Sequence, residues 1–313
     1  MPSLFNKTNS SSRLAHATVS PRVPIALRRA VVARGIMRDD VIWTPLSGGR
    51  TNQVWLIGSN SGAKQDNALI CKLYGRPDNN PLYPNLAGAE YEALKALHRR
   101  DIAPKPVALL NLDMGEALIY QRLDGEIWSR DGKSVAEMLG KLHDLDLMIP
   151  LHHLPTGSHA LEMQVRAIIA DLREPLPNLP KDVPVKPADA LARLSLIHTD
   201  IVATNIIVTA SGLRLIDWQC PAFGDPCEDL ASFLSPAMQR LYAQEQLSSS
   251  AREAFLDAYP DRKTVTRYRC LAPLFHWRIA AYCNWKVERG DEDYRAAMAL
   301  ELIALNELRG DHE

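Results

Sequence analysis

The sequence predicts an α+β fold with two lobes, a small one built on an antiparallel sheet with one helix and a larger one that is mainly helical. Short β-prone runs alternate with turns through residues 41–121, and a helical apolar period dominates after residue 237. Between them, residues 194–223 contain three short apolar runs separated by polar turns. We expect a tail and helix in residues 1–38, a small lobe in 39–123 and a large lobe in 124–313.

The composition excludes several classes of protein. The chain has 313 residues, 46% of them hydrophobic, which is enough for substantial cores. Its formal net charge of −1 favours neither nucleic acid nor an anionic membrane as a partner, and no apolar run approaches the ~20 residues of a membrane-spanning helix. An odd set of five cysteines without CxxC spacing indicates a reducing, cytoplasmic location. The oligomeric state is left open.

The first 38 residues contain no acidic side chain. Such a composition is typical of a targeting segment, but it also fits a tail that leads into a short helix starting at Pro24. We favour the tail and helix, because the helix runs straight into the first motif. A start codon chosen too far upstream is a third alternative.

The residues that carry chemistry lie in the stretch 194–223. His198, Asp200 and Asn205 share one loop with the spacing H-x-D-x-x-x-x-N, and Asp217 stands where the last strand of the next hairpin ends. Phosphoryl transfer from ATP needs a carboxylate that orients and deprotonates the attacking hydroxyl, and hard oxygen ligands for Mg²⁺. Asp200 suits the first role and is the predicted catalytic residue. Asn205 and Asp217 suit the second role, whereas His198 suits support of the loop by hydrogen bonding.

This stretch resembles the signature of the aminoglycoside phosphotransferase and choline kinase superfamily, which are small-molecule kinases with a protein-kinase-like fold. The resemblance rests on IHTDIVATNIIV and LRLIDWQCPAFGDPCEDLA and spans about residues 40–235. Thr199 departs from the glycine usual in aminoglycoside phosphotransferases, which favours choline kinase-like members. A protein kinase is disfavoured, since the chain has no DFG and no long segment ending in APE. By resemblance, Asp229 would be a buried carboxylate that braces the catalytic loop, and it could also interact favourably with a helix N-terminus.

The small lobe contains the candidate nucleotide-binding residues. The loop SGGRTN resembles the nucleotide loop of choline kinase-like proteins, and its glycines would let backbone N–H groups approach phosphate oxygens. Its candidate contacts are Ser47, Gly48, Gly49 and Asn52. Lys72, the one charge in an apolar strand, would bind the ATP phosphates and pair with a glutamate of the next helix. Glu90 and Glu92 point to different sides of that helix, and the family pattern selects Glu90.

Two further groups of residues are assigned with less support from side-chain chemistry. Gln121 and Leu123 fall where the resemblance places the hinge between the lobes, whose backbone would bind adenine. An aromatic wall can hold a quaternary ammonium by cation–π attraction, although helix-to-helix packing is the ordinary alternative. The candidates for this substrate pocket are Trp218, Trp277, Tyr282 and Trp285. The proline-rich segment 174–187 is expected to be an extended surface loop, either at the substrate mouth or as an inert connector.

Together these patterns predict a phosphotransferase that uses ATP and Mg²⁺ to phosphorylate a hydroxyl of a small molecule. The preferred substrate is an amino alcohol such as choline or ethanolamine. An aminoglycoside, thiamine or sugar kinase of the same superfamily is the alternative within this class. A catalytically silent nucleotide-binding module is the alternative from another class. The sequence does not distinguish ATP from GTP.

Overall fold

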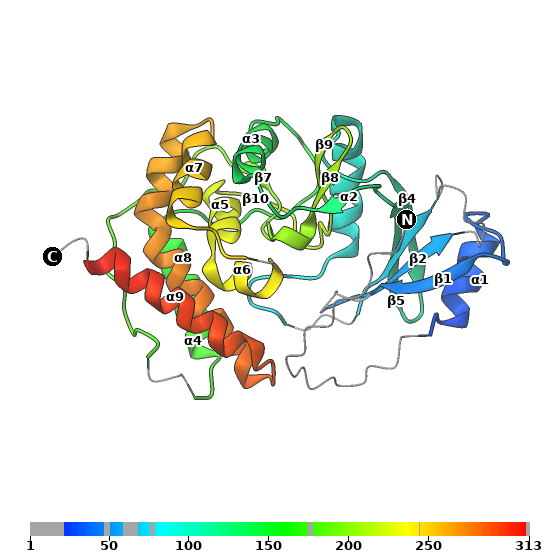
Figure 1. Cartoon of the computed structure of the whole chain (residues 1–313). Helices are drawn as coiled ribbons and strands as arrows, with labels where there is room; N and C mark the ends of the chain where they lie inside the picture. The colour runs from blue at the N-terminus through cyan, green and yellow to red at the C-terminus, as the bar shows by residue number, and fades with distance from the viewer. Residues whose placement is uncertain are drawn as a thin grey trace, which may run out of the picture.

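The computed structural model describes residues 22–46, 51–58, 68–75, 79–174, 178–243 and 245–310. Figure 1 shows two lobes side by side, a small one built on a sheet and a large one that is mainly helical. The small lobe consists of α1 (Ile25–Ala33), β1 (Ile42–Leu46), β2 (Gln53–Gly58), β3 (Leu69–Leu73), α2 (Ala87–Leu97), β4 (Pro106–Leu112) and β5 (Gly115–Gln121). The predicted α+β architecture with its antiparallel small lobe is confirmed.

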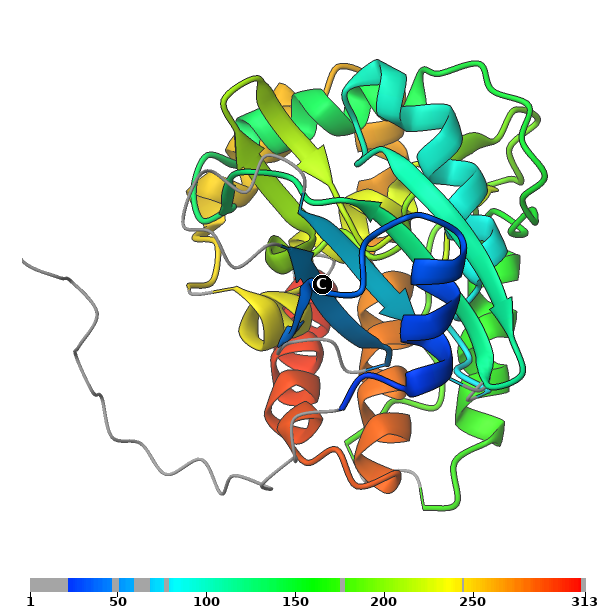
Figure 2. The ribbon, with the colours of Figure 1, turned by 90° about the vertical axis from the view of Figure 1, so that its right-hand side faces the viewer.

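The sheet of the small lobe is antiparallel throughout, with the strand order β1-β2-β3-β5-β4. β3 is central and buried on both faces, so alternate side chains serve different cores. Leu69, Cys71 and Leu73 pack under α1, which crosses the outer face of the sheet in Figure 2. Ile70 and Lys72 therefore point to the inner face, where α2 and the large lobe lie. Because side chains alternate along β3, Lys72 points to the junction of the lobes.

The large lobe begins with a short strand and two helices and continues through the motif-bearing strands. Its first elements are β6 (Glu126–Ile127), α3 (Gly132–His143), α4 (Ser158–Ala170), β7 (Ser195–Ile197), β8 (Ile206–Thr209), β9 (Gly212–Leu215) and β10 (Ala222–Gly224). β8 and β9 form the predicted hairpin, and β6 pairs with the free edge of β8. β7 does not join them but pairs with β10 instead. The loop between β7 and β8 therefore connects two sheets: it leaves the β7–β10 pair and enters the β8–β9 hairpin.

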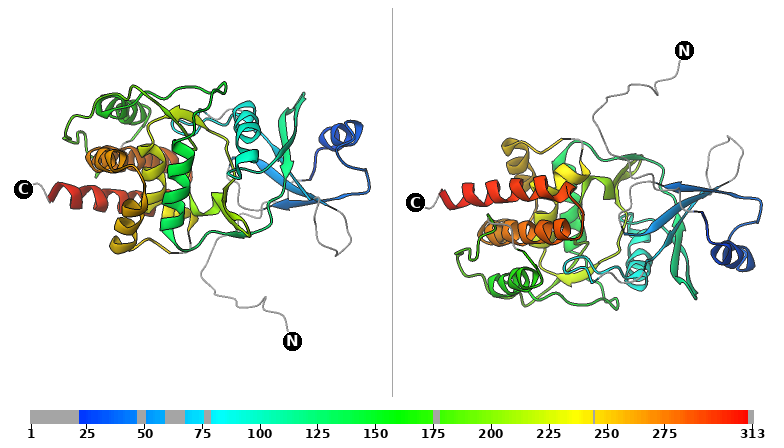
Figure 3. Two further views of the ribbon diagram at one scale, coloured as in Figure 1. Left: turned by 90° about the horizontal axis from the view of Figure 1, so that it is seen from above. Right: turned by 90° about the horizontal axis from the view of Figure 1, so that it is seen from below.

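The C-terminal part of the chain is helical, as its apolar period predicts. It contains α5 (Cys227–Leu234), α6 (Pro236–Tyr242), α7 (Ser249–Ala258), α8 (Arg262–Glu288) and α9 (Asp293–Gly310). Figure 3 shows α8 and α9 lying side by side from above and from below. In the described part of segment 174–187 there is no helix or strand, but Leu179 and Val183 are buried in the core of the large lobe. The expectation of a surface loop is therefore wrong for these two side chains, because apolar residues between the prolines have a core to enter. No helix in the described ranges combines the length and the apolar character needed to cross a membrane.

Candidate active site

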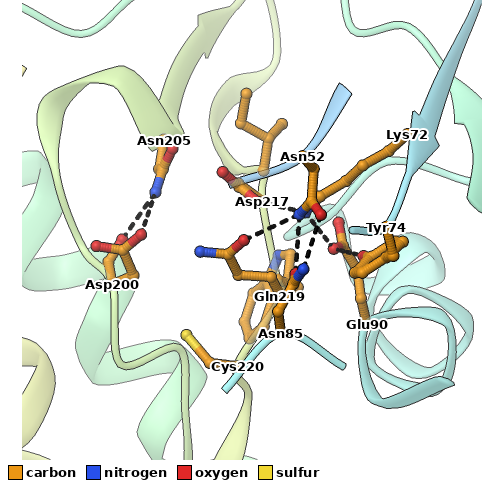
Figure 4. A network of polar contacts seen from close by, with 12 residues as sticks. Asn52, Lys72, Tyr74, Asn85, Glu90, Asp200, Asn205, Asp217, Gln219 and Cys220 are labelled. Atoms are coloured by element: carbon orange, nitrogen blue, oxygen red, sulfur yellow. Dashed lines mark hydrogen bonds and ion pairs between the residues drawn. The ribbon is translucent and has the colours of Figure 1, made fainter. Parts of the chain in front are cut away.

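A buried ion-pair cluster joins three elements where the lobes meet. The Nζ atom of Lys72 on β3 lies 2.6 Å from Oε2 of Glu90 on α2 and also contacts the carboxylate of Asp217, just after β9 (Figure 4). Lys72 is 3% exposed and Glu90 is fully buried. The hydroxyl of Tyr74 donates to the same Glu90 oxygen. Glu92 pairs with Lys95 instead, so Glu90 is the glutamate that meets Lys72.

The protonation of this cluster follows from burial and from the balance of its charges. Burial lowers the pKa of Lys72, but the charges of Asp217 and Glu90 outweigh that effect and leave the pKa of the ammonium raised. Burial raises the pKa of Glu90, as does the negative charge of Asp217, while Lys72 acts in the opposite direction. Lys72 is thus charged at neutral pH, and the two carboxylates depend on it for compensation.

Removal of the lysine is expected to destabilise the fold. Lys72→Met should lower the free energy of unfolding by about 3 kcal/mol, because Glu90 stays buried beside Asp217 without a cation. The measurement is urea denaturation of the purified variant. Lys95→Met is the matched control, since Lys95 makes an exposed pair on α2 that solvent screens. Equal effects in the two variants would contradict a structural role of the buried pair.

The loop after β7 carries the predicted catalytic residues. Nδ2 of Asn205 donates to the backbone oxygen of Asp200 at 3.0 Å and to its carboxylate at 3.2 Å. His198 accepts a hydrogen bond from the Asp200 backbone N–H at Nδ1 and donates from Nε2 to the backbone oxygen of Ile216. These contacts need the neutral imidazole with its proton on Nε2. Burial, followed by the charge of Asp217, raises the pKa of Asp200 to about 7, which suits a proton acceptor at neutral pH.

The side chain of Asp229 binds the backbone at the start of this loop. Its two carboxylate oxygens accept the backbone N–H groups of His198 (2.9 Å) and Thr199 (2.7 Å), and the side chain has no exposed surface. Nε2 of His143 lies 3.0 Å from the same carboxylate, and its Nδ1 lies 2.8 Å from the hydroxyl of Tyr259. The placement of Asp229 agrees with the bracing role implied by the resemblance. Sequence reasoning assigned His143 only to packing or capping, because its partners lie 86 and 116 residues away.

Two residues of the site adopt left-handed backbone conformations. Thr199 has φ 70° and Asp217 has φ 62°. Aspartate tolerates this region, but a β-branched threonine is strained there. Here the backbone N–H of Thr199 is held by Asp229, and its hydroxyl donates to the backbone oxygen of Cys220 at 2.9 Å. Hydrogen bonds to the rest of the site therefore offset the strain.

Replacement of the bracing carboxylate tests this arrangement. Asp229→Asn should lower the free energy of unfolding by about 2 kcal/mol. In the wild type each carboxylate oxygen accepts one backbone N–H, of His198 or of Thr199, and in the variant one of these N–H groups would face the amide NH₂ and lose its acceptor. Urea denaturation measures the change. Asp144→Asn is the control, since Asp144 is an exposed carboxylate at the end of α3. An Asp229→Asn protein as stable as this control would show that the loop does not depend on the brace.

A cavity of about 410 Å³ lies above the loop and reaches both lobes. One part is apolar, with Val54 and Ile70 from the small lobe and Ile207 and Ile216 from the large lobe. The other part is lined by Lys72, Asp200, Asn205 and Asp217. An apolar slot suits a purine ring, and a lysine beside carboxylate and amide oxygens suits a triphosphate with Mg²⁺. The residues present thus fit ATP and the metal, and the side chain of Asp217 is 35% exposed toward this space.

The predicted nucleotide contacts are distributed unevenly. Ser47, Gly48 and Gly49 lie outside the described residues. Asn52 and Leu123 line the cavity, whereas Gln121 is exposed and does not line it. Both polar atoms of the Asn52 side chain are already bonded to protein groups. Sequence reasoning missed these partners, Asn85 and Gln219, which no motif singled out.

The four residues predicted for the aromatic pocket do not line the described cavity. The indole N–H groups of the three tryptophans donate to protein oxygens, Trp218 to Leu215, Trp277 to Pro180 and Trp285 to Asp171. The ring of Tyr282 meets Tyr83 edge-on at 5.2 Å and stacks on Trp285 at 5.9 Å. These side chains therefore pack against other parts of the protein, which was the alternative to a substrate pocket.

The sequence matches the phosphotransferase enzyme family over residues 42–274, well over half of the chain. The chain belongs to this family. Thiamine kinase of Escherichia coli O157:H7 is 29% identical over 157 residues, which cover 46% of this chain and 50% of that protein. The match thus spans about half the length of this relative.

Solved structures show the same fold at low identity. A choline/ethanolamine kinase family protein from Mesorhizobium loti superposes with a TM-score of 0.56 at 17% identity, covering 90% of this chain and 93% of the other. An ethanolamine kinase from Plasmodium vivax gives 0.57 at 15% identity, covering 89% and 86%. At identities this low, the likeness shows that this chain shares the fold of these kinases.

Proposed function

We propose that the protein transfers the γ-phosphoryl group of ATP to a hydroxyl group of a small molecule. The observation that carries this proposal is the meeting of Lys72, Asn205, Asp200 and Asp217 around one cavity between the lobes. Membership of the phosphotransferase enzyme family supports the same reaction class. A protein that only bound nucleotide would need the lysine but would have no use for a carboxylate with a pKa of about 7 beside the metal ligands.

Each residue would have a distinct task in this reaction. Lys72, held by Glu90, positions the phosphates of ATP, and the backbone near Leu123 borders the adenine slot. Asn205 and Asp217 would hold Mg²⁺, which supplies neutralisation of the phosphate charge when bound. Asp200 orients the acceptor hydroxyl and takes its proton, and the hydrogen bond from Asn205 keeps the carboxylate turned toward the cavity. His198 and Asp229 keep the loop in shape.

For the acceptor we infer an amino alcohol such as choline or ethanolamine. Among the described residues that line the cavity, the carboxylates are Asp200 and Asp217, and both have tasks in the transfer. A polycationic aminoglycoside would need further carboxylates, so the cavity supports a substrate with a single cationic group. Tyr242 lines the cavity, where its ring can face an ammonium group.

Thiamine is the second candidate, and a specific observation favours it. The relative with 29% identity is a thiamine kinase. Thiamine also combines a primary alcohol with one cationic nitrogen, so the same chemistry of recognition applies. Thiamine is larger than choline and carries aromatic rings, so it would place more surface against Tyr242 of the cavity than choline would.

A panel of acceptors tests the proposal. ATP consumption by the purified protein with Mg²⁺ should be measured with choline, ethanolamine, thiamine, an aminoglycoside and a sugar, and phosphorylated products identified by mass spectrometry. We expect turnover with choline or ethanolamine, and turnover with thiamine alone would select the second candidate. Binding of ATP without turnover on any acceptor would favour the silent nucleotide-binding module.

A further inference from the structure

Three carboxamide side chains meet at the edge of the cavity, and two of them, Asn52 and Gln219, are among the residues that line it. Asn52 and Asn85 form a reciprocal pair, in which each Nδ2 donates to the other Oδ1 at 2.8 Å. Nδ2 of Asn52 also donates to Oε1 of Gln219 at 3.2 Å, and Oδ1 of Asn52 accepts the backbone N–H of Gly75 at 3.3 Å. Figure 4 shows the three amides facing one another beside the Lys72 cluster. We call this group the amide clasp.

The amide of Asn52 has no hydrogen-bonding capacity left for a ligand. A primary amide has two N–H donors and two lone pairs on its oxygen. In Asn52 both donors and both acceptor positions are engaged by Asn85, Gln219 and Gly75. Because the backbone N–H of Gly75 can only donate, it identifies the oxygen of Asn52 and excludes the flipped amide. Asn52 therefore acts on other parts of the protein, although its loop lies at the nucleotide cavity.

The clasp connects the chain segments that carry the charged cluster. Gly75 follows Lys72 by three residues, Asn85 precedes Glu90 by five, and Gln219 follows Asp217 by two. A further bond, from the backbone N–H of Leu86 to the backbone oxygen of Gln219 at 3.0 Å, joins the last two segments directly. The three charged side chains meet at the Lys72 ammonium, and the three chain segments that carry them meet again at Asn52, through the backbone of Gly75 and the side chains of Asn85 and Gln219.

We propose that Asn85 and Gln219 are positioning residues that use Asn52 to set Asp217 relative to Lys72. Asn52 stands directly before β2, so its amide connects this strand of the small lobe to Gln219 in the large lobe. A shift of Gln219 would move the carboxylate two residues before it. The inference rests on the proposed function, since it assigns Asp217 to the metal.

Mg²⁺-dependent nucleotide binding provides the test. The variants are Asn85→Ala, Gln219→Met, which keeps the length of the side chain without its acceptor, and the double variant. Asn111→Ala is the matched control, an exposed asparagine on β4 of the same lobe. Calorimetry on the full chain should give the Kd of ADP once with Mg²⁺ and once with EDTA.

The expected result is a selective loss of the metal contribution. In the clasp variants the Kd of Mg·ADP should rise about tenfold or more, as is usual when groups that orient metal ligands are removed. The Kd of ADP in EDTA should change less than about threefold, because Lys72 and the adenine slot remain. The double variant should lose little more than either single one, since all bonds converge on Asn52. An equal loss with and without Mg²⁺ would reduce the clasp to general structural support and overturn the positioning role of Asn85 and Gln219.

Hydrogen exchange gives a readout that needs no ligand. The backbone amides of Gly75 and Leu86 should exchange faster in the clasp variants than in the wild type, and Asn111→Ala should leave them unchanged. Unchanged protection of both amides would also overturn the inference. A wild-type protein that binds no Mg·ADP would instead refute the proposed function, and the exchange data would then decide on the clasp alone.

Discussion

Asp217→Ala is expected to abolish phosphoryl transfer, with a loss of turnover of about 10³-fold or more. The physical reason is that Asp217 is the charged member of the proposed Mg²⁺ pair, and metal neutralisation of phosphate charge contributes several kcal/mol to such reactions. The fold should survive, because Lys72 keeps its buried partner Glu90. The measurement is the turnover of ATP with the acceptor that the panel identifies, together with a thermal unfolding curve.

The backbone conformation of Asp217 calls for a second variant. Alanine is strained at φ 62°, whereas asparagine adopts this region readily. Asp217→Asn keeps the shape and an oxygen ligand but removes the charge, so it should lose less activity than Asp217→Ala and be at least as stable. Near-normal turnover of a folded Asp217→Ala protein would remove the proposed mechanism.

Asp200→Ala should have the second-largest effect, a fall in kcat of about 10²–10⁴-fold, the range typical of general-base assistance. The KM for ATP should stay within about threefold of the wild-type value, because Lys72, Asn205 and Asp217 remain to hold the nucleotide. Stability should not fall, since the variant removes a half-buried carboxylate whose pKa is raised by burial and by Asp217. Steady-state kinetics with ATP varied, and then with the acceptor varied, separates the two parameters.

A comparison of the two variants distinguishes their roles. Asp217→Ala should weaken the binding of Mg·ADP, whereas Asp200→Ala should leave it unchanged. If Asp200→Ala weakened Mg·ADP binding as strongly as Asp217→Ala, Asp200 would belong to the metal site, and another group would have to accept the proton. If it retained more than about a tenth of the wild-type kcat, below the range for a general base, the assignment of Asp200 would be wrong.

The predictions that the structure supports rest on local patterns. Lys72 was selected as the one charge in an apolar strand, and alternation along β3 places it opposite the face covered by α1. The helical period separated Glu90 from Glu92, and the resemblance to the family selected Glu90. The loop spacing brought Asn205 back to Asp200, since the short 3₁₀ turn Ala203–Asn205 closes the loop. In each case the periodicity or spacing of a few residues determines where the side chain points.

The predictions that failed required knowledge of packing. Trp277 and Trp285 have the spacing of one helical face, which is the same whether that face lines a pocket or lies against other parts of the chain. In the fold α8 packs against α4, and Trp277 bonds to the segment that follows α4. The side chains of Leu179 and Val183 were assigned to the surface because prolines exclude regular structure, but prolines do not prevent burial of their neighbours.

The sequence by itself indicated the reaction class and the elements that carry each charged residue, because the family motifs and their short spacings can be read from the chain. Only the tertiary structure decided that Asn52 bonds to Asn85 and Gln219, that His143 and Tyr259 contact each other beside Asp229, and that Trp218 packs on His198. Such contacts join residues up to 167 positions apart. They depend on how the lobes and helices pack, and no local pattern in the chain records that packing.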